Sequence, residues 1–123
     1  MEIQLETREP HTIQSYSDSS VTVNHTVYSK SIVLSRDTLV SDWPVTQPSE
    51  LNADTLHTLI ALQPEIIILG SHTPDALRRL TVIRQLCEQN IGVESMDIGA
   101  ACRTFNVLLS EERAVVLGMI YRS

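Results

Sequence analysis

Three residues that could do chemistry stand close together near the end of the chain: Cys102, Arg103 and Asn106. Positions three and four residues apart lie side by side on a helix, so this spacing places the three side chains in roughly one sector. A thiol beside an arginine and near a helix N-terminus can have a lowered pKa, which would make Cys102 a nucleophile. The structural alternative is that Cys102 is a small buried residue where the helix meets a sheet.

Two further residues could assist such chemistry, and each also has a structural alternative. His72 could act as the base for a nucleophilic thiol, although no His or Asp stands at a fixed spacing from Cys102. Asp97 precedes the same predicted helix and is interpreted as its N-cap, with general base as the alternative role. Arg103 could pair with Asp97 or Glu94, or it could contact an anion or a partner.

The second half of the chain alternates predicted helices and strands, and these elements position the residues named above. Glu65–Gly70 is a continuous apolar run rich in Ile, which is the pattern of a strand buried on both faces. Helices are expected where apolar residues recur every three or four positions, and strands where short apolar runs are bounded by turns. The pattern predicts helices over 52–62, 75–89 and 99–109, and strands over 65–70, 93–96 and 113–120. Asn52 is a candidate N-cap of the first of these helices.

A candidate site follows from where these strands end. Ligands of open α/β sheets bind beyond the carboxyl ends of strands, near a switch in strand order. Strands 65–70 and 93–96 each lead into a predicted helix N-terminus, whose free N–H groups favour anions. We therefore expect a groove for a ligand or partner at these two strand ends. The residues expected to form it are Ser71, His72, Asp97, Gly99, Cys102, Arg103 and Asn106.

The first half of the chain, up to about residue 45, is rich in Ser, Thr and Val and is predicted to form β-structure. Short runs at 13–17, 21–23, 26–28 and 31–34, separated by turn clusters, indicate an antiparallel meander with one buried face. Trp43 lies in a proline-containing connector and is expected to pack over the sheet. The prediction is one domain, 1–123, with a layered α/β fold, a mixed β-sheet, antiparallel N-terminal strands and a C-terminal βαβαβ part.

The composition argues against several classes of function. The net charge is −6, with one lysine and eight scattered arginines, which argues against a nucleic-acid partner and against an anionic membrane surface. The longest apolar run, 66–69, is far too short for an integral membrane segment. The acidic N-terminus has no signal-peptide pattern, and the two cysteines are expected to be free thiols. We therefore expect a cytoplasmic protein.

No metal or other cofactor is expected. The four histidines are isolated in the sequence, and no Cys-x-x-Cys or His-x-x-x-His spacing occurs. The phosphate-binding loop, the nucleophile elbow and the full dinucleotide fingerprint are also absent. The sequence therefore identifies no catalytic motif.

Four segments, 13–16, 64–70, 92–97 and 100–111, carry a resemblance to a known family, and the Ala-Ala-Cys-Arg-Thr-Phe-Asn run at 100–106 is fairly specific. Over nearly its whole length the chain resembles the Mth938-like family, also called the DUF498 family. The resemblance implies a compact three-layer α/β domain and no family-wide catalytic residue. Members usually show Gly-x-Gly after the central strand, whereas this chain has Gly70-Ser71-His72. If the position needs φ > 0, His72 would be strained there.

The resemblance also implies a class of function. Bacterial and archaeal members mostly have no assigned activity, mitochondrial members assist assembly of respiratory complex I with a partner protein, and other animal members are linked to adipogenesis. We expect a non-enzymatic protein-interaction module with a protein partner, assisting assembly of a membrane or respiratory complex. Two alternatives remain: a small-molecule or anion-binding domain that uses the predicted groove, and a thiol enzyme that uses Cys102.

Overall fold

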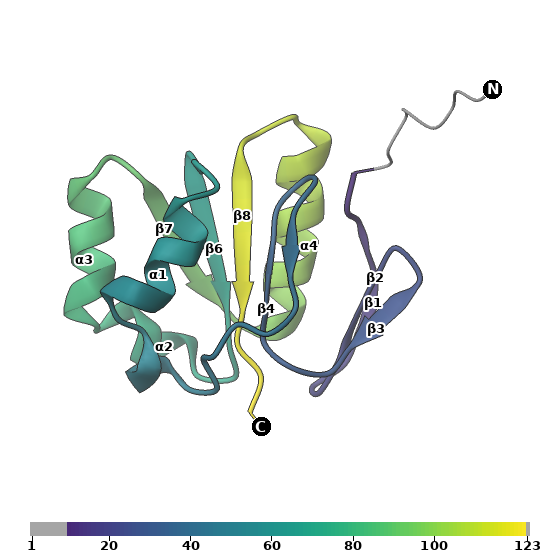
Figure 1. Ribbon diagram of the computed structural model, residues 1–123, viewed down its shortest axis with the longest axis horizontal. Helices are drawn as coiled ribbons and strands as arrows, with labels where there is room; N and C mark the ends of the chain where they lie inside the picture. The colour runs from purple at the N-terminus through teal and green to yellow at the C-terminus, as the bar shows by residue number, and fades with distance from the viewer. Residues whose placement is uncertain (1–9, 123) are drawn as a thin grey trace.

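The computed structural model describes residues 10–122 and contains two sheets (Figure 1). The larger sheet has five strands in the order β5-β4-β8-β6-β7. Strand β6 is parallel to both β8 and β7, while β4 is antiparallel to both β8 and β5. This sheet is therefore mixed, as predicted. Its strands are β4 (Ile32–Leu34), β5 (Leu39–Val40), β6 (Ile66–Gly70), β7 (Gly92–Met96) and β8 (Val115–Met119).

Strands β6 and β8 form the centre of the large sheet because their side chains are apolar on both faces. All of β8 is buried, and so is β6 from Ile67 to its end. Trp43 closes over β8, since two atoms of its ring lie only 3.0 and 3.1 Å from where a Cβ on Gly118 would stand. The indole Nε1 donates a hydrogen bond to the carbonyl of Thr55 at 3.0 Å. The predicted packing role of Trp43 is confirmed.

Helices cover both faces of the large sheet (Figure 1). Helices α1 (Ala53–Ile60), α2 (Pro74–Arg78) and α3 (Thr81–Glu88) share a core with one face, and α4 (Ile98–Ser110) shares a core with the other. Helix α1 begins with a capping box, in which the side chain of Asn52 accepts from the backbone N–H of Thr55. The predicted Asn52 cap is therefore confirmed.

The single helix predicted over 75–89 was wrong, because the chain breaks between α2 and α3. Leu80 is extended there, with φ −73° and ψ 136°. Leu77 and Ile83 are both buried in the same core. Six residues on an unbroken helix would place these two side chains about 120° apart around the axis, so they could not both point straight at the sheet. The break turns both toward the sheet.

The smaller sheet is an antiparallel meander of β1 (Ile13–Tyr16), β2 (Val21–Val23) and β3 (Thr26–Tyr28). A tight turn joins β2 and β3, with positive φ angles at Asn24 and His25, as the sequence predicted. The meander ends with β3. Strand β4 was expected to continue it, but all three of its residues are buried and it pairs with β8 instead. A strand buried on both faces belongs inside the large sheet.

The connections leave the carboxyl ends of β6 and β7 toward opposite faces of the large sheet. The β6-to-β7 connection passes through α2 and α3 on one face, and the β7-to-β8 connection returns through α4 on the other. Adjacent strands with divergent connections define a topological switch point. The fold therefore has such a point at the strand ends where the sequence predicted a groove.

Candidate functional site

Helix α4 begins at the residue predicted to cap it. The Oδ1 atom of Asp97 accepts a hydrogen bond from the backbone N–H of Ala100 at 2.8 Å. The extended backbone of Asp97, with φ −68° and ψ 170°, is the usual conformation of an N-cap residue. Asp97 therefore satisfies a helix terminus, which is the structural role that the sequence indicated.

The inner face of α4 is packed against β6 and β8, and it includes Cys102. Only 1% of this residue is exposed, and it lies in one core cluster with Phe105 and Ile68. Burial raises the pKa of the Cys102 thiol to about 12, and the neighbouring positive charge of Arg103 offsets only part of that rise. A buried thiol that is protonated at neutral pH is a poor nucleophile. The structure therefore favours the structural interpretation of Cys102.

Asn106 uses its side-chain amide to hold the outer edge of β1. Its Oδ1 accepts from the backbone N–H of Ile13 at 3.1 Å, and its Nδ2 donates to the carbonyl of Ile13 at 2.8 Å. This pair of bonds replaces those that a further strand would make, and it joins α4 to the small sheet. Asn106 also lines a hollow of about 420 Å³ with Thr12 and Arg36. That hollow lies apart from Ser71 and His72.

The outer face of α4 carries Arg103, whose expected partners were Asp97, Glu94 or an anion. Instead, its Nη1 donates to the hydroxyl of Tyr16 at 2.5 Å. The Tyr16 ring lies over Gly99, where an added Cβ would stand 2.9 Å from the ring. Val107 is one turn further along and 54% exposed, and Tyr16 is 43% exposed. We call Tyr16, Gly99, Arg103 and Val107 the α4 surface.

His72 is the residue that stands where family members usually have a glycine, and its backbone is not strained. Within residues 10–122, the non-glycine residues with positive φ are Asn24, His25, Gln63, Asn90 and Glu112. The expected strain at His72 is therefore corrected. Its Nε2 donates to the carbonyl of Asp18 at 2.8 Å, and its ring lies 6.4 Å from that of Tyr121. His72 thus holds the turn between β1 and β2.

Two adjoining hollows lie at the carboxyl ends of β6 and β8. The first has a volume of about 260 Å³ and is lined by Thr46, Gln47, Ser71, His72, Thr73 and Arg122, among others. The second has a volume of about 360 Å³ and is lined by Asp18, Ser19, His72 and Arg122. We call these the inner and outer hollows of the carboxyl-edge cleft. Only Ser71 and His72 of the predicted groove residues line it.

The structure thus distributes the residues of the predicted groove over several places and does not gather them in one continuous groove. Ser71 and His72 lie in the carboxyl-edge cleft, whereas Asp97 caps α4 and Gly99 and Arg103 lie on the α4 surface. Cys102 is in the core and Asn106 holds β1. The backbone N–H of Ser71 donates a hydrogen bond to the carbonyl of Met96 at 3.1 Å. The chain itself therefore occupies the space between the ends of β6 and β7, where the groove was predicted.

Sequence reasoning missed Arg122 and Tyr16. Arg122 follows the last predicted strand and belongs to no motif, so no local pattern marks it. Tyr16 is 87 residues from Arg103 in sequence, and only the packing of β1 beside α4 brings them together. Long-range contacts between different elements leave no signal in local periodicity.

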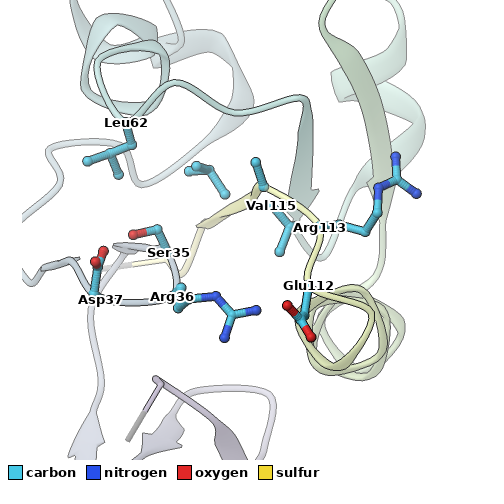
Figure 2. Close-up of a pocket in the computed structure, with 9 residues that line it drawn as sticks. Ser35, Arg36, Asp37, Leu62, Glu112, Arg113 and Val115 are labelled. Atoms are coloured by element: carbon cyan, nitrogen blue, oxygen red, sulfur yellow. The ribbon is translucent and has the colours of Figure 1, made fainter. Parts of the chain in front are cut away.

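A further hollow, of about 300 Å³, lies at the opposite end of the large sheet, beside the start of β8 (Figure 2). Its two arginines are already engaged. Arg36 donates to the carbonyl of Leu109 at 2.7 Å, and Arg113 binds Glu65 through two nitrogens at 3.0 and 3.2 Å. The same ion pair lowers the pKa of Glu65. In Figure 2 the Arg113 side chain points away from the hollow.

A family model described as a protein of unknown function, DUF498/DUF598, matches residues 13–120. The chain belongs to this family. The match covers every strand and helix described above, from β1 to β8. The recognition made from the segments at 13–16, 64–70, 92–97 and 100–111 is therefore confirmed.

A curated relative in the zebrafish Danio rerio is NADH dehydrogenase (ubiquinone) 1 alpha subcomplex assembly factor 3. It is 31% identical over 111 residues, which make up 88% of this chain and 63% of the relative. The chain therefore spans less than two thirds of that relative's length. Relatives of this chain thus include a protein named as an assembly factor of NADH dehydrogenase.

Solved structures of bacterial proteins share the fold. An NMR structure from Xanthomonas campestris has a TM-score of 0.76 and 31% identity, covering 92% of this chain and 86% of that chain. A crystal structure from Bordetella parapertussis has a TM-score of 0.76 and 30% identity, covering 94% of this chain and 98% of that chain. An NMR structure from Bordetella pertussis, described as a Mth938-like domain, has a TM-score of 0.69 and 24% identity, covering 100% of this chain and 95% of that chain. The predicted α/β fold of the Mth938-like type is confirmed.

Two features of the described residues bear on the remaining expectations. In the part of the chain from 10 to 122, no helix has the length and apolar character needed to cross a membrane. Over the same residues, no three His, Cys, Asp or Glu side chains come together in a group able to hold a metal ion.

Proposed function

We propose that this chain is a non-enzymatic protein-interaction module that assists the assembly of a membrane-bound respiratory complex. The observation that carries the proposal is the similarity to an assembly factor of NADH dehydrogenase over 88% of this chain. The similarity therefore involves the folded part of the chain that contains α4. The partner would be a component of the membrane complex or of its assembly.

The α4 surface is the proposed docking contact. Among residues 10–122, the large apolar side chains with substantial exposure are Tyr16, Val27 and Val107, and two of these three flank Arg103. Tyr and Arg are enriched among the residues that contribute most to binding energy at protein interfaces. Arg103 offers guanidinium donors to a carboxylate, and Tyr16 and Val107 offer apolar contact on either side. An acidic residue next to an apolar one on the partner fits this surface.

We do not propose the thiol-enzyme alternative, because the Cys102 thiol is buried and its pKa is raised. Alkylation of the native protein at neutral pH provides the measurement. Cys87 is exposed and should react rapidly, whereas Cys102 should react only when the protein opens. Comparable rates at both cysteines would restore Cys102 as a candidate nucleophile.

We place the docking on the cytoplasmic side of the membrane that holds the complex. The two cysteines support a reducing compartment, because both are free thiols and one of them is exposed. A cell fractionation followed by detection of the untagged chain tests this placement. Recovery in the extracytoplasmic fraction would contradict it.

An affinity pull-down from native lysate, with the membranes solubilised, tests the docking proposal. The wild-type chain is compared with Arg103→Ala and with Arg84→Ala, a matched control in which an exposed arginine is removed from α3 on the other face of the sheet. We expect a respiratory-complex component to be captured by the wild type and by Arg84→Ala but lost with Arg103→Ala. Capture by all three variants would exclude the α4 surface. Failure of the wild type to capture such a component would exclude the assembly function.

A further inference from the structure

The inner hollow of the carboxyl-edge cleft lies where parallel strands of an α/β sheet usually present ligands. Ser71 directly follows β6 and Ile120 directly follows β8, and both line this hollow. Strand ends are rich in backbone and side-chain hydrogen-bonding groups that the sheet does not use. The position is therefore suited to a small polar ligand.

The charge of the inner hollow favours an anion. Arg122 lines it, and within residues 10–122 the ion pairs are Arg78 with Asp75 and Arg113 with Glu65, so Arg122 has no described carboxylate partner. Among residues 10–122, no Asp or Glu lines the inner hollow. Asp18 lines only the outer hollow, and Arg122 and His72 line both and mark the boundary between them.

Hydrogen-bond donors in the inner hollow remain available after its internal bonds are counted. The hydroxyls of Ser71 and Thr73 share one hydrogen bond at 3.3 Å, which uses only one of their two hydrogens. The side-chain amide of Gln47 and the guanidinium of Arg122 add further donors. The Thr46 hydroxyl is not among them, because it donates to Glu50 at 2.8 Å.

In the hollow at the opposite end of the large sheet, the arginine side chains already have hydrogen-bond partners. There, Arg36 is bonded to the carbonyl of Leu109 and Arg113 to Glu65, and Glu112 and Asp37 add negative charge to the lining (Figure 2). An anion entering that hollow would meet engaged arginines and two carboxylates. The inner hollow of the carboxyl-edge cleft has the opposite balance.

We propose that the inner hollow binds a small oxyanion, a phosphate or carboxylate group, with Arg122 as its main ligand and with Gln47 and the Ser71–Thr73 hydroxyl pair as donors. The volume of about 260 Å³ lies below the range of about 300–1,000 Å³ typical of pockets for drug-sized ligands, which favours a small ligand. This site is separate from the α4 surface and does not depend on the docking function.

Titration of the ¹⁵N-labelled protein with inorganic phosphate, at constant ionic strength set with sodium chloride, tests the proposal. We expect saturable shifts of the backbone amides at 71–73 and 120–122. Arg122→Gln should weaken the apparent affinity at least tenfold, and Gln47→Leu should weaken it severalfold. Arg84→Gln, which removes an exposed arginine of α3 that does not line the hollow, is the matched control and should leave the affinity unchanged within a factor of two.

Acetate serves as a second probe and separates carboxylates from phosphates. Saturable binding of either probe at these amides, with loss in Arg122→Gln, supports the site. Shifts that remain linear for both probes, or that persist in Arg122→Gln, overturn it. Both Arg122 and Gln47 are exposed, so the spectra of these variants outside the cleft should match the wild type and thereby establish that they are folded. The result is independent of whether Arg103→Ala loses a partner.

Discussion

The inner and outer faces of helix α4 use neighbouring residues for different purposes. Cys102, Phe105 and Asn106 are turned toward β6, β8 and β1, where they fill the core or bind the backbone. Arg103 and Val107 are next to these residues in the sequence, but they lie on the outer face beside Tyr16. The residues that looked most reactive therefore stabilise the fold. The recognition surface that we propose consists of the residues between them.

The largest effect should come from Phe105→Ala on the inner face. Phe105 is fully buried between α4 and the sheet. Removing a buried aromatic ring leaves a cavity and should lower the free energy of unfolding by about 3–5 kcal/mol. Urea denaturation of this variant and of the outer-face control Val107→Ala measures the contrast. The control should change by less than about 0.5 kcal/mol, and similar losses in both would remove the distinction between the faces.

Asn106→Ala should have the next largest effect. The change leaves both backbone groups of Ile13 without their side-chain partners, and an unsatisfied buried group costs about 1–3 kcal/mol. Amide hydrogen exchange should quicken in β1 and β2 before it does in β6 and β8. Asn106→Asp keeps the acceptor but loses the donor, so it should lie between the wild type and Asn106→Ala. Unchanged exchange in β1 would show that Asn106 does not hold this strand.

Alkaline pH should destabilise the protein through the inner face. The pKa of Cys102 is about 12 in the folded protein, and the thiol of an unfolded chain ionises near about 8.5. Above that lower pKa the unfolded state loses its proton first, so the free energy of unfolding should fall as pH rises, by about 1.4 kcal/mol per pH unit. The contribution is fully present below about pH 8. Urea denaturation from pH 8 to 10 measures it, and an equal slope in Cys102→Ala would contradict the assignment.

Arg103→Ala on the outer face should have the smallest effect on stability. The guanidinium is exposed, and its hydrogen bond to Tyr16 lies at the surface, so the change should stay within about 0.5 kcal/mol. Thermal unfolding measures the stability of this variant. The proposed loss of partner capture should therefore occur without a loss of stability. A loss of stability comparable to that of Asn106→Ala would make Arg103 a structural residue, and the pull-down could no longer be interpreted as docking.

Local patterns predicted much of the fold. The Ile-rich run at 66–69 indicated the central strand, and Asn52 and Asp97 indicated the starts of α1 and α4. The break at Leu80 was not predicted, because apolar periodicity alone did not show that Leu77 and Ile83 share a core. The assignment of β4 to the large sheet was also missed, because β4 pairs with β8 near the other end of the chain and local patterns do not show such a pairing.

Of the candidate site, the sequence by itself determined which strand ends could present ligands, because helix and strand periods are local properties. It also determined the cap at Asp97, which depends only on local helix geometry. Only the tertiary structure decided that Cys102 and Asn106 serve the core and β1, that Tyr16 partners Arg103, and that Arg122 joins His72 in a cleft. These outcomes depend on which elements pack together, and burial and long-range hydrogen bonds exist only once the chain has folded.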